Sequence, residues 1–176
     1  MKKNFIPYNK QFIDSEDIRV VSRVLKSDFL TTGPECLKFE RALSNYVGSK
    51  YAVAVNNGTS ALYLSMLALG ISKDDKVITS ANTFVADANV IKLVRANVIF
   101  YDIDLDTGNL NINHILSLLQ NNKKVKAIIA VHFAGYPLDM KKLRSICKKF
   151  NVLVVEDGCH ALGSSYEDTN NKKYRV

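Results

Sequence analysis

The chain has 176 residues, of which 47% are hydrophobic and 23% charged, a composition typical of a globular domain with its own core. The formal net charge is +7, but the basic clusters at 123–126 and 141–149 have no interleaved aromatic residues, which argues against a nucleic-acid-binding surface. No apolar run approaches membrane-spanning length, and the charged start has no apolar segment behind it, so we expect a cytoplasmic protein. The three cysteines and three histidines lack the spacing of a zinc site, so we expect no metal.

The first part of the chain is predicted to be helical. An amphipathic pattern at 14–26, with Asp14 or Ser15 as its cap, indicates one helix. A loop with turn residues follows at 27–34, and a second helix is predicted at about 35–47. Gly48 is placed to end that helix.

Alternating strands and helices dominate the rest of the chain. The strands are predicted at 51–55, 76–79, 97–101, 125–131 and 152–155, and the helices at 59–69, 84–95, 113–119 and 139–150. The strands are almost continuously apolar, so both faces of the sheet should be covered. We therefore expect a three-layer α/β/α fold with a mostly parallel sheet. The expected organisation is a helical segment at 1–47, an α/β domain at 48–166 and a polar tail at 167–176, for which no element is assigned.

A possible phosphate site follows the first predicted strand. Gly58, Thr59 and Ser60 lie where a helix begins, so free N–H groups, a helix dipole and two hydroxyls meet there. Gly58 would let the backbone approach an anion closely. The alternative is an ordinary helix cap, since Ser and Thr are common at this position. The sequence contains neither a Walker A loop nor the glycine-rich dinucleotide fingerprint.

Three more side chains follow predicted strands, and each has two interpretations. Phe84 could lie flat on a planar ring or be a core aromatic, and in isolation the core is favoured. His132 is a structural histidine more often than a catalyst. Asp157, with His160 close behind, could pair with the ring nitrogen of a flat cofactor or cap the turn that follows.

These candidates gain meaning from their common position at the carboxyl ends of parallel strands, where α/β sheets bind ligands. A phosphate site, an aromatic face and an acid for a ring nitrogen together match pyridoxal phosphate. An aspartate beside the pyridine nitrogen keeps it protonated, which makes the ring an electron sink.

The motifs that carry these residues resemble the DegT/StrS sugar-nucleotide aminotransferases, which use pyridoxal phosphate and have the large domain of fold-type I enzymes. The resemblance rests on four segments, at 29–34, 57–62, 82–86 and 156–163. It implies that the cofactor is bound by Gly58, Thr59, Ser60, Phe84, Asp157 and His160. It also implies that the sugar nucleotide faces Tyr8, Asp28, Phe29, Leu30, Thr31 and Gly58.

Within that family, residues 6–8 and the loop at 27–33 look most like the branch that makes UDP-4-amino-4,6-dideoxy-N-acetyl-L-altrosamine on the pseudaminic acid route. The implied reaction moves an amino group from glutamate to a 4-keto-6-deoxy UDP-sugar. The resemblance also implies a homodimer for the full-length enzyme, with no nucleic acid or membrane as partner.

One part of the family pattern has no counterpart in the sequence. The family lysine, which holds the cofactor as a Schiff base, lies in a Ser-Phe-His-Pro-x-Lys stretch, and the sequence stops at Val176 before any such stretch. We therefore expect the N-terminal part of an aminotransferase, inactive by itself. A non-catalytic relative that binds a nucleotide sugar or pairs with a full-length partner is the alternative. A dehydrogenase-type nucleotide domain is disfavoured because the glycine fingerprint is absent.

Overall fold

A computed structural model describes residues 7, 10–121, 124–167 and 172–176. The chain divides into two compact units, one up to Ala54 and one from Val55 onwards. The division falls within residues 51–55, which the sequence assigned to the first strand of the α/β domain. Within the part of the chain that the structure describes, every helix is too short or too polar to cross a membrane.

The first unit contains two helices, α1 (Ser15–Leu25) and α2 (Pro34–Val47). Asp14 caps α1 as predicted: its carboxylate accepts hydrogen bonds from the N–H groups of Glu16 and Asp17, at 2.8 and 3.0 Å. Gly48 ends α2, also as predicted. Both helices are amphipathic, yet neither contains a buried residue.

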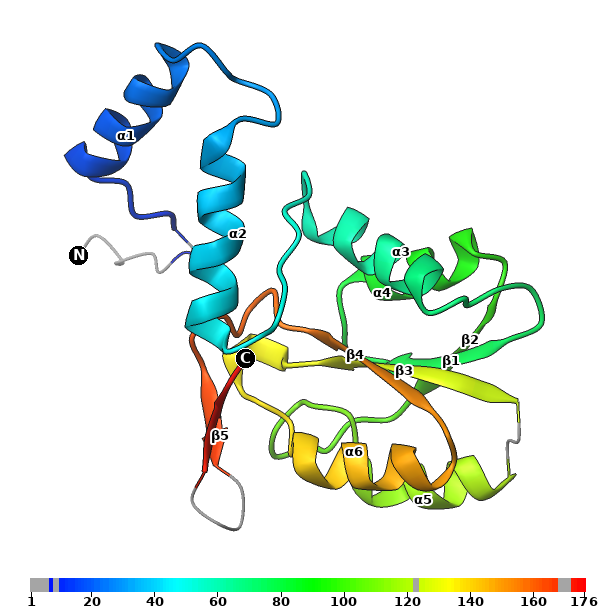
Figure 1. The fold of residues 1–176 in the computed structure, drawn as a ribbon. Helices are drawn as coiled ribbons and strands as arrows, with labels where there is room; N and C mark the ends of the chain where they lie inside the picture. Colours follow the sequence, from blue (N-terminus) through cyan, green and yellow to red (C-terminus); the bar gives the residue numbers. More distant parts are fainter. Residues whose placement is uncertain (1–6, 8–9, 122–123, 168–171) are drawn as a thin grey trace. The chain divides into compact units, whose positions relative to one another are not determined.

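The second unit is built on a parallel sheet in the order β2-β1-β3-β4. Its strands are β1 (Lys76–Ser80), β2 (Asn97–Tyr101), β3 (Val125–Val131) and β4 (Leu153–Asp157). Helices α3 (Gly58–Ala68) and α4 (Val85–Leu93) lie on one face, and α5 (Ile112–Asn121) and α6 (Met140–Lys149) lie on the other (Figure 1). A short 3₁₀ turn, η1 (Phe133–Gly135), follows β3. The predicted α/β/α layering with a mostly parallel sheet is confirmed.

The core has two halves, separated by the sheet. Alternate residues of β3 point to opposite faces, so Ile129 packs with α3 and α4 while Ile128 packs with α5 and α6. Both side chains are fully buried. Because β1 and β3 are central and covered on both faces, their sequences are continuously apolar rather than alternating.

One of the predicted strands is absent. Residues 51–55 do not form a strand, because no described strand lies beside them to complete the hydrogen-bonded ladder. Instead, Tyr51 and Val53 are exposed, and the N–H of Ala54 donates to the carboxylate of Glu40 in α2, at 2.8 Å.

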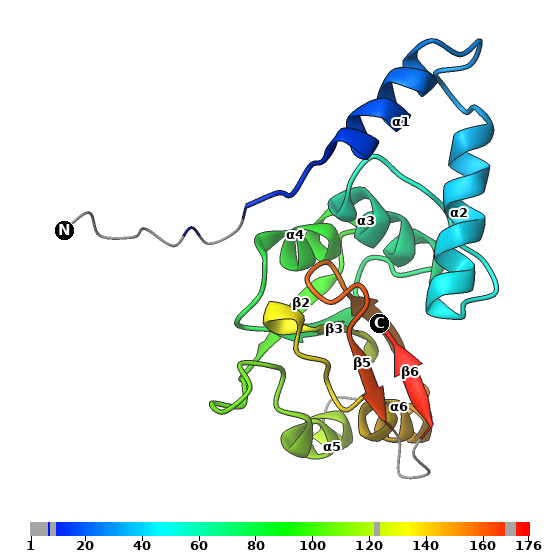
Figure 2. The ribbon, with the colours of Figure 1, turned by 90° about the vertical axis from the view of Figure 1, so that its left-hand side faces the viewer.

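The polar tail, for which the sequence assigned no element, forms part of a hairpin. The strands β5 (Ser165–Glu167) and β6 (Lys173–Arg175) pair as an antiparallel hairpin, and Figure 2 shows them side by side. The rings of Tyr166 and Tyr174 stack across the hairpin with their centroids 5.5 Å apart. That cross-strand aromatic pair stabilises the hairpin in spite of the charged residues around it.

Candidate functional site

The beginning of α3 offers free N–H donors to an anion. The helix starts at Gly58, one residue earlier than predicted, and Asn57 caps it by accepting a hydrogen bond from the N–H of Ser60 at 2.8 Å. The alternative interpretation, in which a Ser or Thr caps the helix, is wrong, because Asn57 is the cap and Thr59 and Ser60 lie within the helix. Among the described hydrogen bonds, none occupies the N–H groups of Gly58 and Thr59, so these donors at the positive end of the helix dipole remain for an anion.

Gly58 also joins this helix start to the end of β4. A Cβ atom added at Gly58 would lie 3.0 Å from the Sγ atom of Cys159, in the turn that follows Asp157. The helix start therefore lies at the rim of the sheet where β4 ends, although no strand leads into α3. Glycine has no Cβ atom, so it fits this close contact without displacing the thiol of Cys159.

Asp157 is the last residue of β4 and is held from two directions. Its side chain is 7% exposed, and its Oδ1 atom accepts a hydrogen bond from the N–H of Cys159 at 2.9 Å. Its backbone oxygen accepts from the N–H of His132, which follows β3, at 3.1 Å. Asp157 thus caps its turn, as one interpretation of the sequence had it, and the carboxylate is fixed at the carboxyl edge of the sheet.

A second buried acid, Asp87, stands next to Asp157 and was not predicted. It lies in the first turn of α4 with a fully buried side chain, and the hydroxyl of Thr83 donates to its Oδ2 atom. Burial raises the pKa of Asp87 to about 6; the bond from Thr83 opposes this rise, and the charge and hydrogen bond of Asp157 add to it. An acid near a helix start is commonplace in sequence, so nothing local distinguished Asp87.

The aromatic and histidine candidates occupy the same edge of the sheet. Phe84 is the N-cap residue of α4 and is 69% exposed, so the interpretation as a core aromatic is wrong. It follows β1, and its backbone oxygen accepts a hydrogen bond from the N–H of Asp87 at 3.2 Å. His160 is exposed in the turn after β4, where its carbonyl oxygen would lie 2.9 Å from a Cβ at Gly135.

His132 is a structural residue, in agreement with the more common role of a lone histidine. Its ring is fully buried, and its Nδ1 atom accepts a hydrogen bond from the N–H of Leu138 at 3.1 Å. Its Nε2 atom therefore carries the proton and lies 3.2 Å from an oxygen of Glu156, which also pairs with Arg144. Burial raises the pKa of Glu156, but His132 and Arg144 together lower it below its usual value.

The residues predicted to face the sugar nucleotide belong to the first unit or lie outside the described chain. Asp28, Phe29, Leu30 and Thr31 are exposed in the loop between α1 and α2, with Phe29 65% exposed. Tyr8 lies outside the described residues. The roles of these residues stay predictions.

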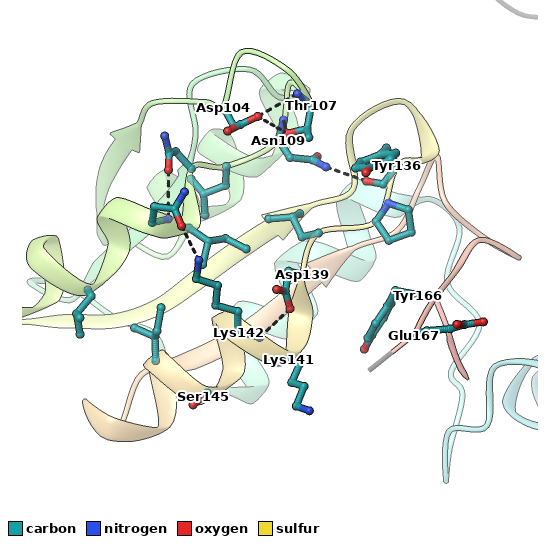
Figure 3. Close-up of a pocket in the computed structure, with 18 residues that line it drawn as sticks. Asp104, Thr107, Asn109, Tyr136, Asp139, Lys141, Lys142, Ser145, Tyr166 and Glu167 are labelled. Atoms are coloured by element: carbon teal, nitrogen blue, oxygen red, sulfur yellow. Dashed lines mark hydrogen bonds between the residues drawn. The ribbon is translucent and has the colours of Figure 1, made fainter. Parts of the chain in front are cut away.

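A separate cavity of about 920 Å³ lies on the other side of the sheet (Figure 3). Its lining comes from the loop before α5, the segment before α6, and α6 and β5; none of the predicted cofactor residues lines it. Several of its polar groups are already paired, for example Asn109, which donates to the carbonyl of Tyr136 at 2.9 Å. The carboxyl edge of the sheet around Asp157, with Gly58 and Phe84, therefore remains the candidate site; we call it the rim.

The chemical groups at the rim match those that pyridoxal phosphate needs. Free N–H groups at Gly58 suit a phosphate, the exposed ring of Phe84 suits a planar ring, and the buried carboxylate of Asp157 suits a protonated ring nitrogen. The described residues contain no group of three or more His, Cys, Asp or Glu side chains placed to hold a metal ion.

Comparisons with known proteins identify the family of the chain. The DegT/DnrJ/EryC1/StrS aminotransferase family matches residues 11–174. The protein MJ1066 of Methanocaldococcus jannaschii, itself uncharacterized, is 42% identical over 167 residues, which cover 95% of this chain and 43% of that protein.

Solved structures show the same likeness. Spr1654 of Streptococcus pneumoniae, assigned as a sugar aminotransferase and solved in a PLP-form, is 32% identical with a TM-score of 0.84, over 92% of this chain and 45% of that one. Helicobacter pylori PseC, an aminotransferase involved in the biosynthesis of pseudoaminic acid, is 34% identical with a TM-score of 0.83, over 94% of this chain and 44% of that one.

The chain thus spans less than half the length of these relatives. Pyridoxal phosphate is the cofactor of the family. On the match over residues 11–174, together with the fold, this chain belongs to the DegT/DnrJ/EryC1/StrS aminotransferase family.

Proposed function

We propose that this chain is the cofactor-binding part of an aminotransferase that moves an amino group from glutamate to a 4-keto-6-deoxy UDP-sugar. The observation that carries the proposal is the contact of Gly58 with Cys159, because it brings the anion-binding end of α3 to the strand end that holds Asp157. The likeness to PseC, and the family resemblance of the loop at 27–33, support a place in pseudaminic acid-type biosynthesis.

Each of these residues would bind a different part of the cofactor. The N–H groups of Gly58 and Thr59, with the hydroxyls of Thr59 and Ser60, would bind the phosphate. Phe84 would cover one face of the ring, and the carboxylate of Asp157 would accept a hydrogen bond from the protonated ring nitrogen and keep it protonated, with His160 close by. Bound pyridoxal phosphate supplies an electron-withdrawing ring that carries the amino group between donor and acceptor.

The substrate side of the proposal rests on the family resemblance. Tyr8 and the loop residues Asp28, Phe29, Leu30 and Thr31 would contact the sugar nucleotide, together with Gly58. In this proposal the full-length enzyme acts as a homodimer. The sequence carries no copy of the Ser-Phe-His-Pro-x-Lys stretch, so we propose that these 176 residues by themselves bind the cofactor without a covalent bond and do not transfer amino groups.

Binding of pyridoxamine phosphate tests the proposal, because this amine form of the cofactor does not form a Schiff base with stray lysines. The chain contains no tryptophan, so isothermal titration calorimetry is the suitable method. We expect saturable binding that Asp157→Ala weakens tenfold or more, on the order of the loss of a hydrogen bond to a charged group.

Asp75→Asn is the matched control, since Asp75 precedes β1 at the opposite edge of the sheet and pairs there with Lys126 at 3.0 Å. It should leave the affinity unchanged. Equal losses in the two variants would refute the site. Formation of 2-oxoglutarate from glutamate and a 4-keto UDP-sugar by these 176 residues would refute the proposed inactivity.

A further inference from the structure

Asp87 is a buried acid to which the proposed binding of the cofactor assigns no role. Its side chain is fully buried in the first turn of α4, which is an expensive place for a carboxyl group. Thr83 donates to its Oδ2 atom, while its Oδ1 atom has no hydrogen-bond partner in the described part of the chain. Such a group needs an explanation, because buried polar atoms are rarely left unpaired.

The neighbours of Asp87 supply that explanation. The charge and hydrogen bond of Asp157, which is itself buried and anchored by the N–H of Cys159, help to raise the pKa of Asp87, so the two carboxyl groups interact. The thiol of Cys159 feels both acids: its hydrogen bond with Asp157, its burial, and the charges of Asp157 and Asp87 raise its pKa to about 11. The three side chains therefore form one cluster at the end of β4.

Two carboxyl groups in one buried place do not ionise independently. Ionising both puts like charges side by side in a medium of low dielectric constant, so the pair retains a proton to a higher pH than a free carboxyl group. The ionisable group that acts on Asp87 is Asp157, on β4, while Asp87 and Asp157 both act on Cys159, in the turn after that strand. Thr83 donates to Oδ2 of Asp87, so Oδ1, which has no hydrogen-bond partner in the described part of the chain, is the oxygen left for Asp157.

We propose that Asp87 is a positioning residue: its protonated carboxyl group donates a hydrogen bond to Asp157 and fixes the carboxylate that faces the ring nitrogen of the cofactor. The second half of this statement rests on the proposed function. The first half, a shared proton between two buried acids, does not. Asp87 itself touches neither cofactor nor substrate in this proposal.

Two substitutions separate the hydrogen bond from the charge. Asp87→Asn keeps a donor of the same shape, whereas Asp87→Ala removes it. Below the pKa of about 6 we expect Asp87→Asn to bind pyridoxamine phosphate like the wild type and Asp87→Ala to bind it about tenfold more weakly. Above that pKa the wild type loses its proton, so its affinity should fall relative to that of Asp87→Asn.

Other outcomes would overturn the proposal. Equal binding by Asp87→Ala and the wild type would remove any role for Asp87. A wild type that binds more tightly than Asp87→Asn above the pKa would mean that Asp87 acts as a second anion rather than as a donor. Circular dichroism checks that each variant is folded, and Asp87→Asn carries the test if Asp87→Ala is not.

A measurement without cofactor keeps the two proposals apart. Carboxyl carbon NMR of labelled aspartates should show that Asp157→Asn lowers the pKa of Asp87, because the neighbouring charge is gone. If the pKa falls but the wild type does not bind pyridoxamine phosphate, the proposed function is wrong and the shared proton stands. If the pKa of Asp87 does not change, the shared proton is refuted whatever the cofactor does.

Discussion

The two units of this chain reach helical structure by different means. In the first unit, α1 has a side-chain cap and both helices have apolar stripes, yet neither contains a buried residue, and Ile18 is 61% exposed. In the second unit, α4 has no side-chain cap, yet it buries side chains against a sheet whose central strands are covered on both faces. Capping and periodicity therefore suffice to specify a helix. A stable core also requires a second surface against which the apolar face of the helix can pack.

The largest expected effect comes from a matched truncation in each unit. Ile128→Ala removes a fully buried side chain from the middle of β3, and we expect it to lower the free energy of unfolding by about 2–5 kcal/mol. Ile18→Ala, on the exposed stripe of α1, should change it by no more than about 0.5 kcal/mol. Urea unfolding followed by circular dichroism measures both. Equal effects would break the comparison, because they would mean that the stripe of α1 is covered in solution.

The pKa values of acidic groups also differ between the two units. Burial raises the pKa of Asp87 to about 6, whereas hydrogen bonds from Arg19 and Lys38 lower the pKa values of the exposed Glu16 and Glu35. Between the unfolded pKa of Asp87 and about 6, the folded chain binds more protons than the unfolded chain. Stability should therefore fall as pH rises through this range, by on the order of 2–3 kcal/mol.

The measurement is the free energy of unfolding as a function of pH for the wild type and Asp87→Asn. The difference between the two curves should change up to about pH 6 and then level off, since only the wild type carries the titrating group. Parallel curves over the whole range would show that Asp87 has an ordinary pKa in the folded chain.

The smallest expected effects on stability come from removing one helix cap in each unit. Asn57→Ala and Asp14→Ala each remove a side-chain cap, which stabilises a helix by about 1 kcal/mol. We expect Asn57→Ala to lower the thermal midpoint, because α3 is packed against the sheet, and Asp14→Ala to lower only the helix content of the first unit. Thermal melts followed by circular dichroism distinguish the two, and equal shifts in the midpoint would show that the units unfold together.

Local pattern determined most of the elements. The strands at 97–101 and 125–131 have the predicted bounds, and the predicted caps at Asp14 and Gly48 are present. These features depend on residues within a few positions of one another: β-branched runs, capping side chains and a glycine that ends a helix. For the same reason, the α/β/α fold with a parallel sheet followed from the order of the elements.

Tertiary contacts decided the rest. Residues 51–55 have the composition of a strand but no neighbour with which to pair, and the hairpin of β5 and β6 exists because two polar segments do pair. Asp87 looks like an ordinary acid at a helix start until the fold buries it beside Asp157. A sequence specifies which hydrogen bonds and charges a segment offers; only the folded chain specifies which partner meets them and how much water is left around the pair.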